Sequence, residues 1–189
     1  QSVRGLMPGF LQVRIPAGER AGEWPRPRHA RRMLVLQGCV QPGIKPNINA
    51  AAARVLDRIG ISLIAASEAG CCGALAHHLN DTEDGLAAAR RNIDAWLPHL
   101  DAGVEAIVMT ASGCGVMVKD YGWLLRLDPA YAEKAARVSA ATKDISEILV
   151  AERTALAPLA ARRSPLAAKK IAYHPPCTLQ HGQKLTGGV

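Results

Sequence analysis

The sequence is poor in aromatic residues and contains no long hydrophobic run. Only 4% of its 189 residues are Phe, Trp or Tyr, so the core must be built from alanine and aliphatic side chains. No apolar stretch approaches the ~18 residues that a membrane-spanning helix needs, and we therefore expect no transmembrane segment. The length and the 49% hydrophobic content suit one globular domain or slightly more.

Several chemical signatures are also missing. The chain has no Ser-His-Asp order for nucleophilic catalysis and no phosphate-binding loop, and Gly113-Cys114-Gly115 lacks the third glycine of a dinucleotide fingerprint. The five cysteines are an odd number, which does not suit a disulfide framework. They also lack the paired C-x2–4-C spacing that structural zinc usually draws. We therefore expect the cysteines to serve metal binding or redox chemistry and not disulfide bonding.

The net charge of +7 is concentrated at the amino-terminal end. Residues 1–32 hold seven arginines against two glutamates, which leaves only +2 for the rest of the chain. A basic stretch can indicate nucleic-acid binding, but this one is broken by four prolines and has few aromatic rings to stack on bases. We interpret residues 1–32 as a solvated basic linker and expect no nucleic-acid partner.

Apolar runs and helix signals alternate along the rest of the chain. Short apolar runs over residues 33–37, 61–66 and 106–110 predict buried strands. Helices are expected from Asn47, after a cap at Asp81, and from a capping-box pattern of Asp144 with Glu147 through about residue 157. Residues 119–121 are expected at the surface. This order predicts an α/β fold with a parallel sheet.

Cysteines follow each of the three predicted strands. In parallel sheets the carboxyl ends of the strands form the edge where ligands bind. The adjacent Cys71 and Cys72 would form a strained disulfide and diverge too far to share one small ion, whereas a polynuclear cluster offers each sulfur its own iron. Four thiolates are the usual ligands of one [4Fe–4S] cluster. The candidate ligands are therefore Cys39, Cys71, Cys72 and Cys114. A zinc site and buried, inert thiols remain alternatives.

Residues beside these cysteines are candidates for tuning the site. Gly73, Gly113 and Gly115 would let backbone N–H groups approach the sulfurs, and such hydrogen bonds help to set a cluster potential. His78, beside His77, could donate to a sulfur or relay a proton. The alternative for these histidines is a helix start satisfied by backbone or solvent.

A faint repeat predicts the domain organisation. Arg31-Arg32 precede an apolar strand and Cys39, and Lys169-Lys170 precede residues 171–173 and Cys177. A second cysteine doublet at the same interval would fall beyond the end of the chain, so we expect a fragment. The expected parts are residues 33–150 as a first domain, 151–170 as a linker and 171–189 as the start of a truncated second repeat, with Cys177 as its candidate ligand.

Specific strings in the sequence resemble a known family. They include HARRMLVLQGCVQPGIKPNINAAAARVLD, AGCCGALAHHLND, EAIVMTASGCGVMVKDYG and YHPPCTLQHGQKL. They resemble the cysteine-rich CCG domain of heterodisulfide reductase B subunits and related iron–sulfur subunits, and within that family they are most similar to the iron–sulfur subunits of glycolate oxidases (glycolate dehydrogenases). The resemblance extends over residues 22–189. It implies two CCG repeats behind a ferredoxin-like module, from which residues 1–32 would lead.

The resemblance also implies a function. Such a subunit has no catalytic residue of its own and holds a [4Fe–4S] cluster, while FAD is expected only in a partner subunit that oxidises glycolate to glyoxylate. Electrons then pass towards the quinone pool, which places the protein in the cytoplasm at the inner face of the cell membrane. The full motif ends in C-x-x-C, and Ala111 stands at its first position, which leaves either a four-ligand cluster or a degenerate structural site. Alternatives are a docking module with zinc or no metal, and the equivalent subunit of a lactate or glycerol-3-phosphate dehydrogenase.

Overall fold

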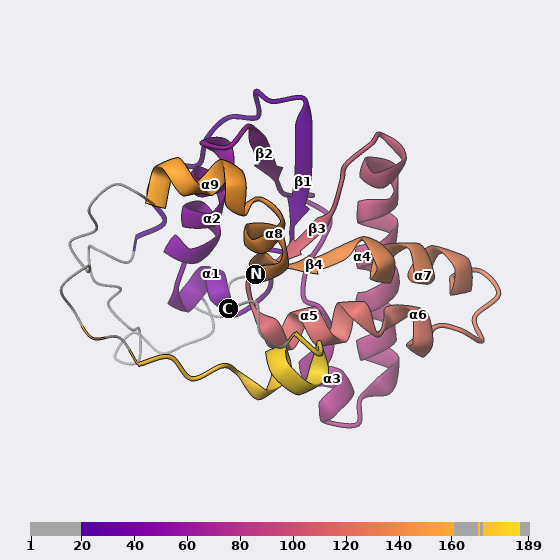
Figure 1. Ribbon diagram of the computed structural model, residues 1–189. Helices are drawn as coiled ribbons and strands as arrows, with labels where there is room; N and C mark the ends of the chain where they lie inside the picture. Colours follow the sequence, from indigo (N-terminus) through magenta and orange to yellow (C-terminus); the bar gives the residue numbers. More distant parts are fainter. Residues whose placement is uncertain (1–19, 161–169, 171, 186–189) are drawn as a thin grey trace, which may run out of the picture.

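The fold is built around a four-stranded parallel sheet. The computed structural model describes residues 20–160, 170 and 172–185. The strands are β1 (Arg31–Val35), β2 (Ile61–Ile64), β3 (Ile107–Met109) and β4 (Thr142–Asp144), and they lie in the order β2-β1-β3-β4 (Figure 1). Leu34 at the centre pairs with Ile64 on one side and Ile107 on the other. The α/β fold with a parallel sheet that the sequence predicted is confirmed.

Helices cover both faces of the sheet because successive strand residues point to opposite sides. Met33 and Val35 pack with α2 (Asn47–Asp57) and α8 (Ile145–Ala151), whereas Leu34 packs towards α4 (Thr82–Asp101) and α7 (Ala132–Ala141). The first cluster is completed by Ala53, Leu56, Ile61, Leu63, Val108 and Ile148, and the second includes Ile93, Trp96, Ile107, Met109, Ala135 and Val138. The molecule therefore has three layers, and both core clusters are largely aliphatic.

Short helices gather at the carboxyl edge of the sheet, where the arrowheads of the strands end (Figure 1). They are α1 (Gln41–Ile44), α3 (Ala74–His78), α5 (Ser112–Lys119), α6 (Tyr121–Leu124) and the π-helical turn η4 (Thr178–Gly182), while α9 (Arg153–Ala160) follows α8. Two predicted helix starts are confirmed. The Asp81 side chain accepts from the Asp84 backbone N–H, and Asp144 and Glu147 form the capping box.

Several elements differ from the sequence-based expectation. β4 was not predicted, because it is three residues long and polar, and the sheet buries Thr142 and Asp144 through hydrogen bonds. The last helix breaks at Glu152 into α8 and α9, so part of the expected linker is helical. Tyr121, which was expected at the surface, is 0% exposed. Ile171 lies outside the described residues, and Ala172 and Tyr173 after it are not in a strand.

The described part of the basic amino-terminal stretch is tied to the edge of the sheet. The Trp24 indole N–H donates to the carbonyl oxygen of Leu63, and the backbone N–H groups of Arg28 and His29 both donate to the Ser62 hydroxyl. Residues from Trp24 onwards therefore pack along β2 rather than stand away from the domain.

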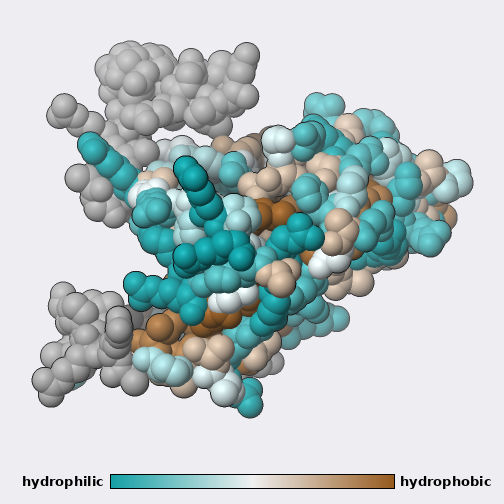
Figure 2. Space-filling model, turned by 90° about the horizontal axis from the view of Figure 1, so that it is seen from above, coloured by the Kyte–Doolittle hydropathy of each residue, from teal (hydrophilic) through white to brown (hydrophobic). Residues whose placement is uncertain are grey.

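The surface at the amino ends of the strands is mostly hydrophilic, with smaller hydrophobic areas between the polar side chains (Figure 2). Arg31 lies at this end and bridges Glu105 and Glu152, which ties β1 to the residues before β3 and after α8. None of the described helices is long and apolar enough to cross a bilayer.

Candidate metal centre

The structure brings the four predicted ligands to one edge of the sheet. Cys39 lies in the loop between β1 and α1, the doublet Cys71-Cys72 lies between β2 and α3, and Cys114 occupies the first turn of α5. Each loop leaves the carboxyl end of a strand, which is the arrangement that the sequence predicted. Segments that are far apart in the sequence thus meet at one place.

The four thiols form two pairs that also interact with each other. The Sγ atoms of Cys39 and Cys71 are 3.3 Å apart. Cys72 interacts most strongly with Cys114 and also interacts with Cys71. Electrostatic interactions also join Cys114 to Cys39 and Cys71. Cys39 is exposed, Cys71 and Cys114 are half-buried, and Cys72 is buried. The set therefore extends from the core to the surface.

Interactions between the thiols, together with burial, shift their pKa values in different directions. Burial, followed by the hydrogen bond to Cys71, raises the pKa of Cys39 to about 11. The hydrogen bond with Cys114 and then burial raise the pKa of Cys72, and the same hydrogen bond lowers that of Cys114. Cys114 is therefore the member of this pair that loses its proton first.

Two buried polar side chains hold the cysteine doublet. The Tyr121 hydroxyl donates to the carbonyl oxygen of Cys72 at 2.7 Å, and the Asn92 amide donates to that of Cys71 at 2.8 Å. Asn92 also donates to the Tyr121 hydroxyl at 3.1 Å and accepts from the Gly70 N–H at 2.9 Å. Both side chains are 0% exposed. A network of this kind fixes a loop because each broken bond would leave a buried polar group unpaired.

A second polar network supports the side of the site that carries Cys39. The Thr110 hydroxyl donates to the Asn49 side-chain oxygen at 2.5 Å, and the Gln41 amide donates to the Thr110 hydroxyl at 3.0 Å. These bonds join α1 and α2 to the end of β3. The loop between β1 and α1 is thereby held beside the residues that lead into α5.

The predicted neighbours of the cysteines take different positions. Gly73 has φ +85° and its backbone N–H lies 3.4 Å from the Sγ atom of Cys71, so it approaches a sulfur. Gly113 is exposed with no atom near its Cβ position, and Gly115 is buried against Gln183. His78 is exposed at the end of α3, and among the described residues it has no hydrogen bond to a cysteine sulfur.

Cys177 lies apart from the two thiol pairs. It is exposed and immediately precedes η4. It lines a hollow of about 660 Å³ together with His77, His78 and Asp120. The structure therefore places this candidate ligand of the second repeat beside α3 and α5, the helices that follow the doublet and carry Cys114.

An apolar recess of about 310 Å³ adjoins the cysteines. Its walls include Cys39 and Cys114 together with Ala111, Ile44 and Ile48. Ala111 stands at the position where the full cysteine motif has a thiol, and its methyl group here forms part of the apolar wall. One side of the site is therefore apolar.

The four thiols suit an iron–sulfur group better than a single metal ion. Within residues 20–160, 170 and 172–185, no three His, Cys, Asp or Glu side chains are placed to hold a single metal ion as they stand. The thiols pair instead of converging on one point. Four cysteines from three loops, in mutual contact at one edge, do fit the four-thiolate donor set of an iron–sulfur group.

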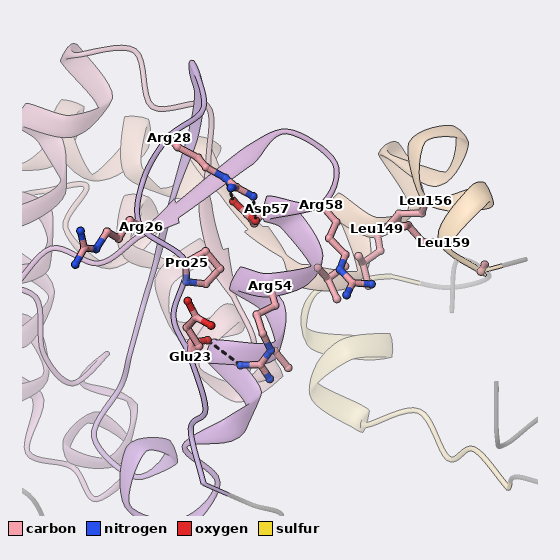
Figure 3. A pocket seen from close by; sticks show the side chains of 13 residues that line it. Glu23, Pro25, Arg26, Arg28, Arg54, Asp57, Arg58, Leu149, Leu156 and Leu159 are labelled. Carbon is pink, nitrogen blue, oxygen red and sulfur yellow. Dashed lines mark hydrogen bonds and ion pairs between the residues drawn. The ribbon is translucent and has the colours of Figure 1, made fainter. Parts of the chain in front are cut away.

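Another cavity among the described residues lies away from the sheet edge and contains no cysteine. It measures about 960 Å³ between α2 and the α8–α9 pair and is lined by arginines and leucines (Figure 3). Arg28 forms an ion pair with Asp57, and Arg54 donates to the backbone oxygen of Glu23. With no thiol and no histidine in its wall, this cavity does not take part in the candidate centre.

Comparison with known proteins agrees with the cysteine arrangement. The family described as CCG, "Cysteine-rich domain", matches residues 33–119, which include all four paired cysteines. The chain contains a CCG domain. It is 53% identical over 189 residues to the glycolate oxidase iron–sulfur subunit of Escherichia coli (strain K12), an alignment that covers 99% of this chain and 45% of that protein. The chain is therefore a homologue of glycolate oxidase iron–sulfur subunits.

More distant relatives share shorter stretches. A protein of Bacillus subtilis (strain 168) named as a probable glycolate oxidase iron–sulfur subunit is 33% identical over 64% of this chain and 26% of its own length. Lactate utilization protein A of Bacillus licheniformis is 29% identical over 59% of this chain and 45% of its own length. The aligned part covers less than half the length of each of these relatives. No solved structure matches it.

Proposed function

We propose that the chain is the iron–sulfur electron-transfer part of a glycolate dehydrogenase complex. The observation that supports this most directly is the gathering of Cys39, Cys71, Cys72 and Cys114 at one edge of the sheet. The homology to glycolate oxidase iron–sulfur subunits supports the same role. The flavin-containing subunits would oxidise glycolate to glyoxylate with FAD, and electrons would leave towards the quinone pool.

The proposal assigns roles to residues of this chain. The four paired cysteines would hold a [4Fe–4S] cluster, which when bound accepts and releases one electron at a time. The Gly73 N–H would donate to the sulfur of Cys71, and the Tyr121–Asn92 network would keep the doublet in place. Cys39 is exposed, so the flavin subunit would approach on its side. We propose a cytoplasmic location at the inner face of the membrane, because the electrons would pass from this chain towards the quinone pool in the membrane.

The domain organisation is part of the proposal. Residues 33–150 would be the first CCG repeat, 151–170 its connection, and 171–189 the opening of a second repeat with Cys177 as a ligand of its own site. The basic residues 1–32 would follow a ferredoxin-like module. The partial coverage of the relatives, 45% for the protein of E. coli, supports a longer full-length chain.

Metal analysis of anaerobically prepared protein tests the proposal. We expect about four iron and four sulfide per chain and a paramagnetic signal in one redox state. Cys72→Ser should abolish the signal, whereas Cys177→Ser, which changes an exposed thiol outside the two pairs, should retain it. Two or fewer metal atoms per chain without a cluster signal would overturn the proposal and favour a docking module with zinc or no metal.

A sibling substrate is the second candidate function. It rests on the 29% identity to Lactate utilization protein A. The cysteine motifs do not carry substrate specificity, so the choice would lie with the flavin subunit. Co-purification followed by assay of that subunit with glycolate, lactate and glycerol 3-phosphate distinguishes them. Preference for glycolate supports the first proposal.

A further inference from the structure

The segment after residue 170 is built into the candidate centre. η4 packs on α5, the helix whose first turn carries Cys114. The hydroxyl groups of Ser112 and Thr178 are 2.7 Å apart, and the Gln183 amide donates to the carbonyl oxygen of Ser112 at 3.0 Å. Ser112 is two residues before Cys114 and opens α5. Two contacts from the η4 segment therefore reach Ser112 in the first turn of α5, the helix that carries Cys114.

Gln183 links this start to a rigid part of the fold. Its amide also approaches the Asp144 carboxylate at 3.3 Å, and Asp144 is the buried residue that ends β4 and caps α8. Gln183 itself is only 9% exposed. It therefore bridges the first turn of α5 and the junction of β4 with α8.

Two glycines make the close contact possible. A Cβ atom on Gly115 would lie 2.5 Å from the Gln183 side-chain nitrogen, and one on Gly182 would lie 2.5 Å from the Val116 side chain. Real Cβ contacts are not this short, so a larger residue at either position would displace the side chain that faces it. Gly115 of α5 thus leaves room for the Gln183 side chain, and Gly182 of η4 leaves room for the Val116 side chain.

The start of α5 has no cap of its own. Its N-cap residue is Ala111, which has no side chain that could accept from the first backbone N–H groups. An uncapped first turn frays more readily than a capped one. The η4 segment does not cap these N–H groups, but it holds the uncapped turn from outside through the carbonyl and hydroxyl groups of Ser112.

We propose that Gln183 is a positioning residue for Cys114, acting through the carbonyl group of Ser112. Without it the first turn of α5 loosens, and the Cys114 thiol loses its fixed place beside Cys72. This position of the Cys114 thiol in metal-free protein does not depend on the proposed function. Any consequence for a bound cluster rests in addition on the proposed function.

The test is the rate at which iodoacetamide modifies each cysteine of reduced, metal-free protein, read by peptide mass spectrometry. In Gln183→Ala we expect Cys114 to react about fivefold faster, because loss of one buried hydrogen bond raises the population of the opened turn by about that factor. Cys39 and Cys177 should change by less than about twofold. The matched control is Gln180→Ala, a glutamine of the same turn that has no role in this contact, and it should behave as the unchanged protein.

Gly115→Ala tests the same contact from the other side. Its new methyl group would displace the Gln183 side chain while leaving all hydrogen-bonding groups present, and it should also raise the Cys114 rate. Circular dichroism establishes that each variant is folded. An unchanged Cys114 rate in both folded variants overturns the proposal, and so does an equal rise at all cysteines or a loss of folding in both, because these indicate general loosening.

Loaded protein provides a readout that separates this inference from the proposed function. If a cluster binds, Gln183→Ala should shift its midpoint potential and its paramagnetic signature, and Gln180→Ala should not. Equal potentials in the two variants would count against the positioning role even with the cluster present. If no variant loads a cluster, the proposed function fails, and the alkylation rates still decide whether Gln183 positions Cys114.

Discussion

The Tyr121 hydroxyl donates a 2.7 Å hydrogen bond to the carbonyl oxygen of Cys72, across 49 positions of the sequence. Both residues are buried, and Tyr121 packs in the same core cluster as Cys72. The position of one cysteine of the doublet is therefore set from the core through a hydrogen bond to its backbone.

Tyr121→Phe tests the importance of this bond. The change keeps the ring but leaves the carbonyl of Cys72 without this donor, and we expect it to lower the free energy of unfolding by about 1–3 kcal/mol. Urea unfolding followed by circular dichroism measures the change. Tyr131→Phe is a suitable control, because it removes a hydroxyl that bonds to Asp94 at the surface and should have a smaller effect. Equal losses in the two variants would contradict the role of the buried bond.

Gly73 and Gly113 should respond oppositely to alanine. Gly73 has φ +85°, and a Cβ atom there would lie 2.6 Å from the carbonyl oxygen of Gly85. Gly73→Ala should therefore destabilise the protein by at least about 2 kcal/mol through backbone strain and collision. Gly113→Ala places a methyl group in open space on a helix, and it should be neutral or stabilising by up to about 1 kcal/mol. Thermal melts of both variants measure this contrast.

The Asp57 carboxylate predicts a loss of stability in acid. Hydrogen bonds from Arg28 are the main reason that the pKa of Asp57 lies below its usual range. Because the unfolded chain binds this proton more readily, the stabilisation is present above the ordinary pKa of about 4 and disappears as the pH falls below it. The urea midpoint should fall between pH 5 and pH 3, and less so in Asp57→Asn. Asp101→Asn, which breaks an exposed ion pair with Arg137, should leave the acid response as it was.

The pairing of Cys39 with Cys71 predicts slow alkylation of Cys39 at neutral pH. Its pKa is raised to about 11, by burial and then by the hydrogen bond to Cys71, whereas an ordinary thiol titrates near 8.5. The rate for Cys39 in metal-free protein should keep rising well above pH 9. In Cys71→Ala the rise should come at lower pH, because the interaction with Cys71 no longer raises the pKa of Cys39. A profile for Cys39 that levels off near pH 8.5 in the unchanged protein would show that the pair does not form.

The sequence was sufficient to predict the sheet and the edge at which the cysteines meet. Strand position follows from short apolar runs, and parallel strands place their following loops on one side. β4 escaped prediction because its burial depends on hydrogen bonds of Thr142 and Asp144 and not on apolar side chains. The start of β1 at Arg31 was missed for a similar reason, since ion pairs with Glu105 and Glu152 place that charged residue in the sheet.

The residues that support the site could not be predicted from the sequence. Asn92 and Tyr121 act through bonds that span 21 and 49 positions, and no local pattern marks them. The doublet, by contrast, is visible because adjacent cysteines are unusual. The sequence predicted that the Gly115 N–H would approach a sulfur, yet this N–H donates to the carbonyl oxygen of Ala111. Its small size instead admits the Gln183 side chain.

The contact of Gln183 with Ser112 joins residues that are 71 positions apart, and this has a consequence for the timing of biosynthesis. At about 5–20 residues per second, several seconds pass between the synthesis of α5 and that of the segment that anchors it. During this interval all four paired cysteines have already been made, while the first turn of α5 lacks its support. The nascent chain therefore presents its thiols before their arrangement is complete, so metal delivery or oxidation at that stage would meet a different site from the one in the finished protein.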